Sequence, residues 1–322
     1  MLKKTISLLL VLGLLTALPG CSLLGQGDAP AATSGADLPA DDPEADFSSD
    51  TRKAQAFTEP AGYATLNADE KKLYDRLMFE IQALEPVTHL NGDAQQDEVN
   101  KVFEYILYDH PEFFYLHPKL NLQTNGTSVQ KITYTYYMTA DEVAQAQDVI
   151  DQMVRPIIDE LPSIGSDAEQ LRYIHDNVIG IARYYTDYDV NKPYDPNGAM
   201  KDNEVYRDCS NIFGALVRGE AVCSGYARAF QYIANLAGFY CIRVIGYADN
   251  VGHEWNLVKM DDQIYYIDPT YDDPGYADDG GGTSAGTPRE NYFMISEDTL
   301  LEDHTLPYKT KYGYPIPGNT NG

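Results

Sequence analysis

One segment near the carboxyl end, residues 251–268, constrains the fold of this chain more than any other. Two strand-forming runs, Glu254–Met260 and Gln263–Asp268, are separated only by Asp261–Asp262. This spacing leaves room for a tight two-residue turn, so the two runs are predicted to pair as an antiparallel β-hairpin. Any even-length turn would give the same pairing of sheet faces, because strand side chains alternate with a period of two.

The hairpin predicts that a histidine and a carboxylate lie on one face of the sheet. In the expected register Trp255 faces Asp268, and His253 stands two residues before Trp255 on the same face. A carboxylate there can bind one imidazole nitrogen and leave the other free to take a proton. A histidine kept only for solubility would not need Asp268 on its own face beside an apolar tryptophan.

A cysteine upstream supplies a nucleophile for this pair. Cys223 lies in the run VCSGYA, where a helix is expected to begin and to end at Gly238, a suitable left-handed cap. A thiol at a helix amino terminus feels the positive end of the helix dipole, which favours the thiolate. Gly225 has no side chain, which would let a substrate carbonyl approach the thiol. A lone buried cysteine would fit this pattern equally well, so the prediction depends on His253 and Asp268 as partners in acyl transfer.

Three motifs in this order resemble the catalytic core of the transglutaminase-like superfamily, best of all its bacterial surface members. They are VCSGYARAF after Gly219, GHEWN at 252–256 and IDPTYDDP at 267–274. The resemblance covers residues 166–304 well. It implies an α+β fold with a papain-like core, in which the nucleophile helix packs on an antiparallel sheet. It also implies that Cys223 is the nucleophile, His253 the general base and then acid, and Asp268 the orienting carboxylate.

Several neighbouring residues are expected to support these three. The backbone amide of Cys223 is the first predicted oxyanion donor, and Tyr185 is the candidate for the second. Trp255 is expected to shield the bond between His253 and Asp268 from water. His175 and His304 are interpreted as structural.

The amino terminus reads as a targeting segment. Lys3 and Lys4 precede an apolar run at 6–17, which is too short to span a bilayer comfortably. The sequence Leu-Pro-Gly-Cys that ends at Cys21 resembles the lipobox of bacterial lipoproteins. Residues 1–20 are therefore predicted to be a signal peptide, with Cys21 lipidated, and 21–57 a disordered tether. Ordinary secretory cleavage is the alternative.

Composition excludes some partners. The chain of 322 residues carries 23 basic and 49 acidic residues, a net charge of −26, which repels phosphate backbones. Nucleic acid is therefore excluded as a partner, and contact with the membrane is expected only through the lipid on Cys21. Apolar residues make up 43% of the chain, enough for a globular core.

Local signals divide the remainder into two regions, a small, mostly helical α+β region at 58–162 and a catalytic domain at 163–322. Three capping boxes predict helix starts at Asn67, Thr139 and Ser166, and another helix should end near His110. The first of these helices should carry Leu84 in its apolar stripe and end at Pro86. The run 129–138 predicts one strand, and residues 187–203 an irregular stretch.

No cofactor or metal is expected. The 6 histidines and the cysteines do not fall into close ligand pairs in the sequence, and no glycine loop suits a phosphate. The acidic residues Asp272, Asp273, Asp278 and Asp279 could attract calcium, but they lack EF-hand spacing, so a mobile loop rimming the cleft is the preferred interpretation. Cys209 and Cys241 are expected to be small buried residues, with a disulfide as the alternative.

These observations predict a monomeric cysteine acyl-transfer enzyme, lipid-anchored on the extracytoplasmic face of a bacterial membrane. It would act on amide bonds of proteins or peptides through a thioester, with cell-wall peptides among the candidate substrates. Hydrolysis is the preferred outcome, and protein cross-linking the alternative. A surface binding module that kept the fold without catalysis is the alternative of another class, and the intact triad argues against it.

Overall fold

Local capping determines where the long helices begin. The computed structural model describes residues 59–186, 204–277, 287–307 and 310–317. In it α2 (Ala68–Gln82), α4 (Ala140–Glu160) and α5 (Asp167–Ile181) each start at a capping box. Their first residues follow Asn67, Thr139 and Ser166, as predicted, because a capping box is satisfied by contacts within four residues.

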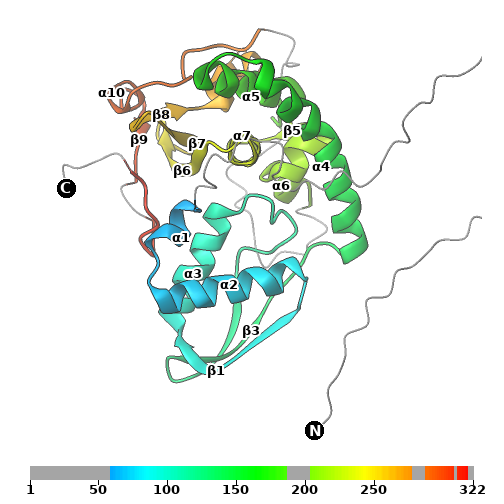
Figure 1. Ribbon diagram of the computed structural model, residues 1–322, viewed down its shortest axis with the longest axis vertical. Coiled ribbons are helices and arrows are strands. Elements are labelled where there is room, and N and C mark those ends of the chain that lie inside the picture. The colour runs from blue at the N-terminus through cyan, green and yellow to red at the C-terminus, as the bar shows by residue number, and fades with distance from the viewer. Residues whose placement is uncertain (1–58, 187–203, 278–286, 308–309, 318–322) are drawn as a thin grey trace, which may run out of the picture. The chain divides into compact units, whose positions relative to one another are not determined.

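The amino-terminal region combines helices with a small sheet. Its elements are α1 (Ala61–Thr65), α2, β1 (Val87–Gln95), α3 (Gln96–Asp109), β2 (Asn121–Asn125) and β3 (Ser128–Thr133). The three strands pair antiparallel in the order β1-β3-β2. α3 contacts β1 and β3, and α2 packs beside α3 (Figure 1).

The sequence predicted only one of these strands, and it predicted it too long. β3 ends at Thr133, and beyond it the chain makes a single bridge between Leu116 and Tyr136. β1 was not predicted from the sequence. Its pairing with β3 shifts register between His89 and Ala94, and this irregularity breaks the alternation of apolar residues. β2 escaped because most of its side chains are exposed.

The first long helix also ends earlier than expected. α2 stops at Gln82, and Leu84 adopts a positive φ of 53° outside the helix. Leu84 therefore does not extend the helical stripe toward Pro86, although it still packs against the core.

The carboxyl-terminal region follows α4 and a 3-10 turn at Leu161–Ser163, and it begins with α5. Its further elements are β4 (Arg183–Tyr184), α6 (Glu204–Cys209), a π-helical turn at Gly214–Arg218, β5 (Glu220–Ala221), α7 (Cys223–Leu236), β6 (Tyr240–Ala248), β7 (Val251–Met260), β8 (Gln263–Ile267), α8 (Pro269–Asp272), α9 (Pro274–Ala277), α10 (Glu297–Leu300) and β9 (His304–Thr305). An antiparallel sheet forms in the order β8-β7-β6-β9.

A helix packed on this antiparallel sheet is the central feature of the region. Figure 1 shows α7 nearly end-on beside β6 and β7, with which it is in contact. Asn256 of β7 donates a hydrogen bond of 2.8 Å to the Ala227 carbonyl of α7, tying helix to sheet. The predicted α+β class is confirmed: the helix that begins at Cys223 packs on an antiparallel sheet and is preceded in the chain by a small α+β region.

The hairpin has the predicted register. Met260 pairs with Gln263 across Asp261 and Asp262, whose φ angles of 50° and 60° are those of a tight I′ turn. The ladder ends where Asn256 pairs with Ile267. The next position on each strand is Trp255 opposite Asp268, so the shared face of His253 and Asp268 is confirmed.

Both predicted regions contribute to one buried core. Residues from α2 and α3 belong to the same apolar cluster as residues from α7 and β7. Arg243 of β6 donates to the Leu107 carbonyl at 3.3 Å, and Gln231 of α7 donates to the Tyr108 carbonyl at 2.8 Å. The proposed boundary between 162 and 163 stays a prediction.

Some predictions fall outside the described residues. These are the signal peptide at 1–20, Cys21, the tether at 21–57, the irregular stretch at 187–203, and Asp278 and Asp279. Among the helices that the structure describes, none has the length and apolar character needed to cross a membrane.

Candidate active site

Asp268 lies at the junction between β8 and α8. It caps α8, and its Oδ1 accepts the backbone N–H groups of Thr270 at 2.9 Å and Tyr271 at 3.2 Å. Pro269 follows at the first helical position, which suits its fixed φ. The carboxylate is fully buried, and the backbone of α8 holds its Oδ1 oxygen.

His253 lies on β7 and reaches the other oxygen of this carboxylate. Its Nε2 is 2.6 Å from Asp268 Oδ2. An ionised carboxylate can only accept, so Nε2 carries the proton of this bond and Nδ1 is left for the thiol. Burial disfavours the charged ring, but the charge and hydrogen bond of Asp268, with the neighbouring Cys223, raise the pKa of His253 to about 10. Burial likewise opposes ionisation of Asp268, yet His253 and His304 hold the pKa of its carboxyl well below the ordinary value.

Cys223 is the first residue of α7, where no side chain caps the helix. It is the partly exposed member of the described cysteines, whereas Cys209 and Cys241 are buried and unpaired with each other. Burial raises the pKa of Cys209 to about 12 and also raises the pKa of Cys241. The structure thus contains one thiol that combines access, a helix amino terminus and an adjacent imidazole. The alternative prediction, a disulfide between Cys209 and Cys241, is wrong.

Trp255 packs where the shielding role was predicted. Its side chain is fully buried, and its ring stacks on His253 with centroids 6.0 Å apart. It also meets His304 edge-on at 4.8 Å. This position is compatible with the predicted shielding of the bond between His253 and Asp268, which stays a prediction.

Glycine is required at position 225 for a different reason from the one predicted. A Cβ at this position would lie 2.4 Å from the Cys209 carbonyl and 2.8 Å from the Ala221 Cβ. The Cα of Gly225 therefore faces the protein interior, and the interpretation that it opens a path for a substrate carbonyl is wrong. The glycine instead lets α7 pack closely on the residue that ends α6.

Tyr185 directly follows β4 in the chain. Its backbone N–H donates to the Ala221 carbonyl at 2.9 Å, and its ring meets Tyr206 edge-on. Its neighbour Tyr184 contacts Tyr226 and Tyr276 instead. The role of Tyr185 as second oxyanion donor stays a prediction.

The acidic residues after α8 act as internal supports. Asp272 and Asp273 are fully buried. Asp273 accepts from the Tyr226 hydroxyl at 2.6 Å, and Asp272 lies 3.3 Å from His175 Nε2. The interpretation of these two residues as part of a mobile rim is therefore wrong, because both are fixed by partners from α5 and α7. The structural interpretation of His175 agrees with its burial.

His304 is the site residue that sequence reasoning missed. It was interpreted as structural, yet its Nε2 lies 3.2 Å from Asp268 Oδ2. The spacing of His304 from the hairpin carries no signal, because β9 joins the sheet on the far side of β6. Gly246 was the available hint: a Cβ there would lie 2.3 Å from the Thr305 carbonyl, so only glycine admits β9.

His253, Asp268 and His304 also form a group of metal-type ligands, although they are far apart in sequence. One ligand atom from each lies within 4.8 Å of the others. A tetrahedral zinc with bonds of about 2.05 Å would hold its ligand atoms about 3.3 Å apart. The 2.6 Å separation between His253 and Asp268 is instead that of a proton-bridged pair. Hydrogen bonding accounts for this group, and the need for no metal or cofactor stays a prediction.

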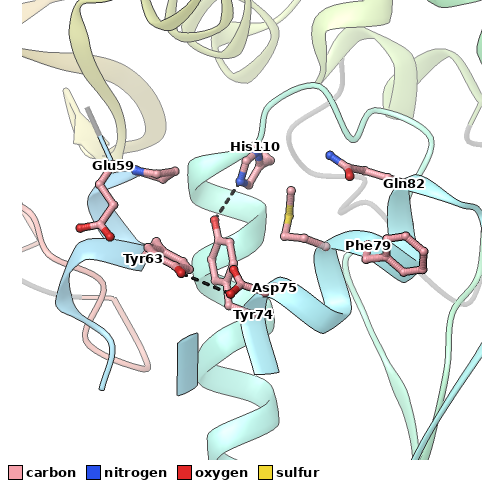
Figure 2. Close-up of a pocket in the computed structure, with 9 residues that line it drawn as sticks. Glu59, Tyr63, Tyr74, Asp75, Phe79, Gln82 and His110 are labelled. Carbon is pink, nitrogen blue, oxygen red and sulfur yellow. Dashed lines mark hydrogen bonds between the residues drawn. The ribbon is translucent and has the colours of Figure 1, made fainter. Parts of the chain in front are cut away.

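A separate hollow lies in the amino-terminal region. It has a volume of about 590 Å³ and is lined by Glu59, Pro60, Tyr63, Tyr74, Asp75, Met78, Phe79, Gln82 and His110. Figure 2 shows the bond from His110 to the Tyr74 hydroxyl at 2.8 Å and that from Tyr63 to Asp75 at 3.3 Å. None of the predicted catalytic residues lines this hollow.

Comparisons with known proteins give partial likenesses. No protein-family model matches the chain. Kyphoscoliosis peptidase of Mus musculus is 26% identical over 160 residues, which are 46% of this chain and 22% of the mouse protein. A solved structure described as a TGase is 15% identical, with a TM-score of 0.34. The aligned region covers 71% of this chain and 53% of the chain in that structure. A cysteine-protease candidate from Cytophaga hutchinsonii is 10% identical over 48% of this chain and 63% of its own, with a TM-score of 0.27.

The chain is thus similar to part of the mouse peptidase and, more distantly, to these two solved structures. It spans about a fifth of the mouse relative and between half and two thirds of the two structures. The chemistry of the site is therefore argued from this chain's own residues.

Proposed function

We propose that this protein is a cysteine acyl-transfer enzyme that cleaves amide bonds of proteins or peptides, with hydrolysis as its main outcome. One observation carries the proposal: an accessible thiol at a helix amino terminus lies beside an imidazole whose far nitrogen is bonded to a buried carboxylate. That order of groups is the one required for a nucleophile, a base and an orienting carboxylate.

The first half of the reaction forms a thioester. The Cys223 proton passes to His253 Nδ1, and the sulfur attacks the amide carbonyl carbon. The developing oxyanion is stabilised by the Cys223 backbone N–H at the start of α7. The carbon–nitrogen bond then breaks as His253 returns its proton to the leaving amine.

The second half resolves the thioester. Water attacks the same carbonyl carbon, His253 takes its proton, and the sulfur leaves, giving a free acid and the original thiol. A primary amine could replace water, and the product would then be a new amide, as in protein cross-linking. Hydrolysis is preferred because water is abundant at a partly exposed thiol, whereas amine transfer requires a dedicated acceptor site.

The proposal is tested by trapping the thioester. Incubation with p-nitrophenyl acetate should add one acetyl group to Cys223, detected by intact mass and removed by hydroxylamine. Cys223→Ala should take up no acetyl group, and Cys209→Ala, which changes a buried thiol at the end of α6, should acylate normally if it folds. Acetylation that persists in folded Cys223→Ala would contradict the proposal.

The choice between outcomes needs a separate measurement. Adding methylamine during turnover of a peptide substrate divides the thioester between free acid and methylamide. Predominant acid at millimolar amine supports hydrolysis, and predominant amide supports the cross-linking alternative. No turnover of any peptide, with a thiol that does not acylate, would favour a binding module that lacks catalysis.

The location is part of the proposal. We expect a lipid anchor on Cys21 at the extracytoplasmic face of a bacterial membrane, supported by the lipobox-like sequence. Cys21→Ala should leave the protein unprocessed or release it from the membrane fraction. A Cys21→Ala protein that remained processed and membrane-bound would require another anchor.

A further inference from the structure

His304 is the second imidazole on the Asp268 carboxylate, and a carboxylate oxygen lies beside each of its ring nitrogens. Its Nε2 lies 3.2 Å from Asp268 Oδ2, and its Nδ1 lies 2.5 Å from Asp303 Oδ1. The side chain is fully buried. Both ring nitrogens therefore face carboxylate oxygens, and ionised carboxylates only accept hydrogen bonds. Two donors are needed at once, and only the imidazolium form supplies them.

Asp268 is saturated by this arrangement. Oδ1 accepts two backbone N–H groups, and Oδ2 accepts from both His253 and His304. Without His304, one buried acceptor position on Oδ2 would be empty and the carboxylate could rotate away from His253. A one-ångström displacement of a catalytic group can cost orders of magnitude in rate.

The rest of the surroundings fix His304 in turn. Asp303 accepts from the Tyr292 hydroxyl through its second oxygen, and the Asp268 N–H donates to the Tyr292 carbonyl at 2.9 Å. The centroid of the His304 ring lies 5.1 Å from that of Tyr271 and 5.5 Å from that of Tyr292. A closed set of contacts therefore links the segment before β9 to the carboxylate of the triad.

We propose that His304 is a positioning residue of the catalytic centre, which holds the Asp268 carboxylate toward His253 and opposes its negative charge. The proposal rests on the function proposed above. The chain of groups is then Asp303, His304, Asp268, His253 and Cys223. In it His304 acts on the thiol only through the other imidazole.

The charge of His304 has a consequence of definite sign. The ring centroids of His253 and His304 are 5.6 Å apart, so the cation on one disfavours the cation on the other. Removing the His304 charge should make the His253 imidazolium persist to higher pH. The charged and titratable groups that contact these two rings in the described residues are Asp268, Asp303, Cys223, Tyr271 and Tyr292.

Two variants separate positioning from charge. His304→Gln keeps a neutral N–H donor that can reach Asp268, and His304→Leu keeps bulk without a donor. Acetylation of Cys223 by p-nitrophenyl acetate is measured from about pH 5 to about pH 12, which spans the alkaline limb, with folding checked by circular dichroism. His304→Leu should react at least about tenfold more slowly, and His304→Gln should recover most of the rate. In both variants the alkaline limb of the profile should move up by about one pH unit.

The matched control is His175→Gln. His175 is another fully buried imidazole between two carboxylates, Asp176 at 2.9 Å and Asp272 at 3.3 Å, but it does not touch Asp268. Its replacement should lower the melting temperature without moving the alkaline limb.

The outcomes distinguish the two proposals. Wild type that fails to acetylate Cys223 would contradict the proposed function. Normal wild-type acetylation with folded His304→Leu that keeps the wild-type rate and profile would overturn the role of His304 alone. Equal losses in His304→Gln and His304→Leu, with an unmoved limb, would also overturn it, because they would indicate only a structural contribution.

Discussion

Two buried aspartates in this protein accept the same number of hydrogen bonds with opposite results. Asp109, at the end of α3, accepts two backbone N–H groups, from Gly62 at 2.9 Å and Tyr63 at 3.0 Å. It also accepts two phenol hydroxyls, from Tyr74 at 2.9 Å and Tyr314 at 2.7 Å. Asp268 likewise accepts two backbone N–H groups, but its two side-chain donors are imidazoles.

The difference lies in the charge that the donors carry. Burial raises the pKa of Asp109, and its hydrogen-bond donors, together with the nearby His110, offset this only in part. Burial also opposes ionisation of Asp268, yet its imidazole partners overcome this and lower its pKa. Phenols tie three chain segments together around Asp109, whereas imidazoles around Asp268 hold a charge that catalysis can use. The same geometry therefore gives a structural tie in one region and, in the other, the charged carboxylate of the proposed catalytic centre.

The largest effect should come from removing His253, the proposed base beside Asp268. His253→Ala should lower the rate of Cys223 acetylation by about four orders of magnitude, because the thiol loses both its proton acceptor and its counter-ion. Stopped-flow release of p-nitrophenol from the folded variant measures this. A rate within tenfold of wild type would mean that another group is the base.

Replacing each aspartate by asparagine tests the comparison directly. Asp268→Asn should lower the acetylation rate by about two orders of magnitude, less than in a serine hydrolase, because a thiol depends less on its base. Asp109→Asn should leave the rate of the folded protein unchanged. Similar losses in both variants would show that the two clusters do not differ in function.

The structural aspartate should show its effect in stability. Asp109→Asn places an amide where backbone N–H groups and phenols need acceptors, so unfolding should become easier by about 1–3 kcal/mol. Urea denaturation with unchanged slope measures this. An unchanged midpoint would mean that Tyr314 and Tyr74 do not tie the carboxyl-terminal segment to α3.

The smallest expected difference between the two aspartate sites is in how the free energy of unfolding depends on pH. The pKa of His253 is raised from 6.5 to about 10, so the folded state holds a proton that the unfolded state releases between these values. This stabilisation is complete below about pH 6.5 and is lost as pH rises toward 10, at up to about 1.4 kcal/mol per pH unit.

The two asparagine variants should change this pH dependence in different ways. Asp268→Asn should flatten the alkaline decline in melting temperature, and Asp109→Asn should not. Because the pKa of Asp109 is raised, its contribution is present below its unfolded value near 3.8 and is lost as pH rises through the folded value. Asp109→Asn should therefore alter the acid side of the curve. Identical curves for the two variants would contradict the contrast in donors.

Prediction from sequence succeeded where the determinants are local. Capping at Asn67, Thr139 and Ser166, the start of α7 at Cys223 and the turn at Asp261–Asp262 each depend on a few neighbouring residues. The proximity of His253 and Asp268 followed from that turn, because strand alternation carries the register for several residues.

Prediction from sequence failed where segments that are far apart in the chain come into contact. His304 reaches Asp268 through β9, and no local pattern records which strand lies beside β6. Gly225 was correctly singled out, but the carbonyl of Cys209, which requires the glycine, comes from another element. Both phenol donors to Asp109 lie more than thirty residues from it in sequence, with Tyr314 separated by 205 residues. Tertiary packing, which a single sequence does not display, decides all three.

The most direct test of the central claim is the reactivity of Cys223 toward iodoacetamide at about pH 6, where an ordinary thiol is almost wholly protonated. Wild type should alkylate at Cys223 at least about tenfold faster than folded His253→Ala, and Cys209 and Cys241 should stay unmodified until the protein unfolds. Site occupancies from peptide mass spectrometry give each rate. Equal rates at Cys223 in wild type and His253→Ala would contradict activation of the thiol by the imidazole that Asp268 holds.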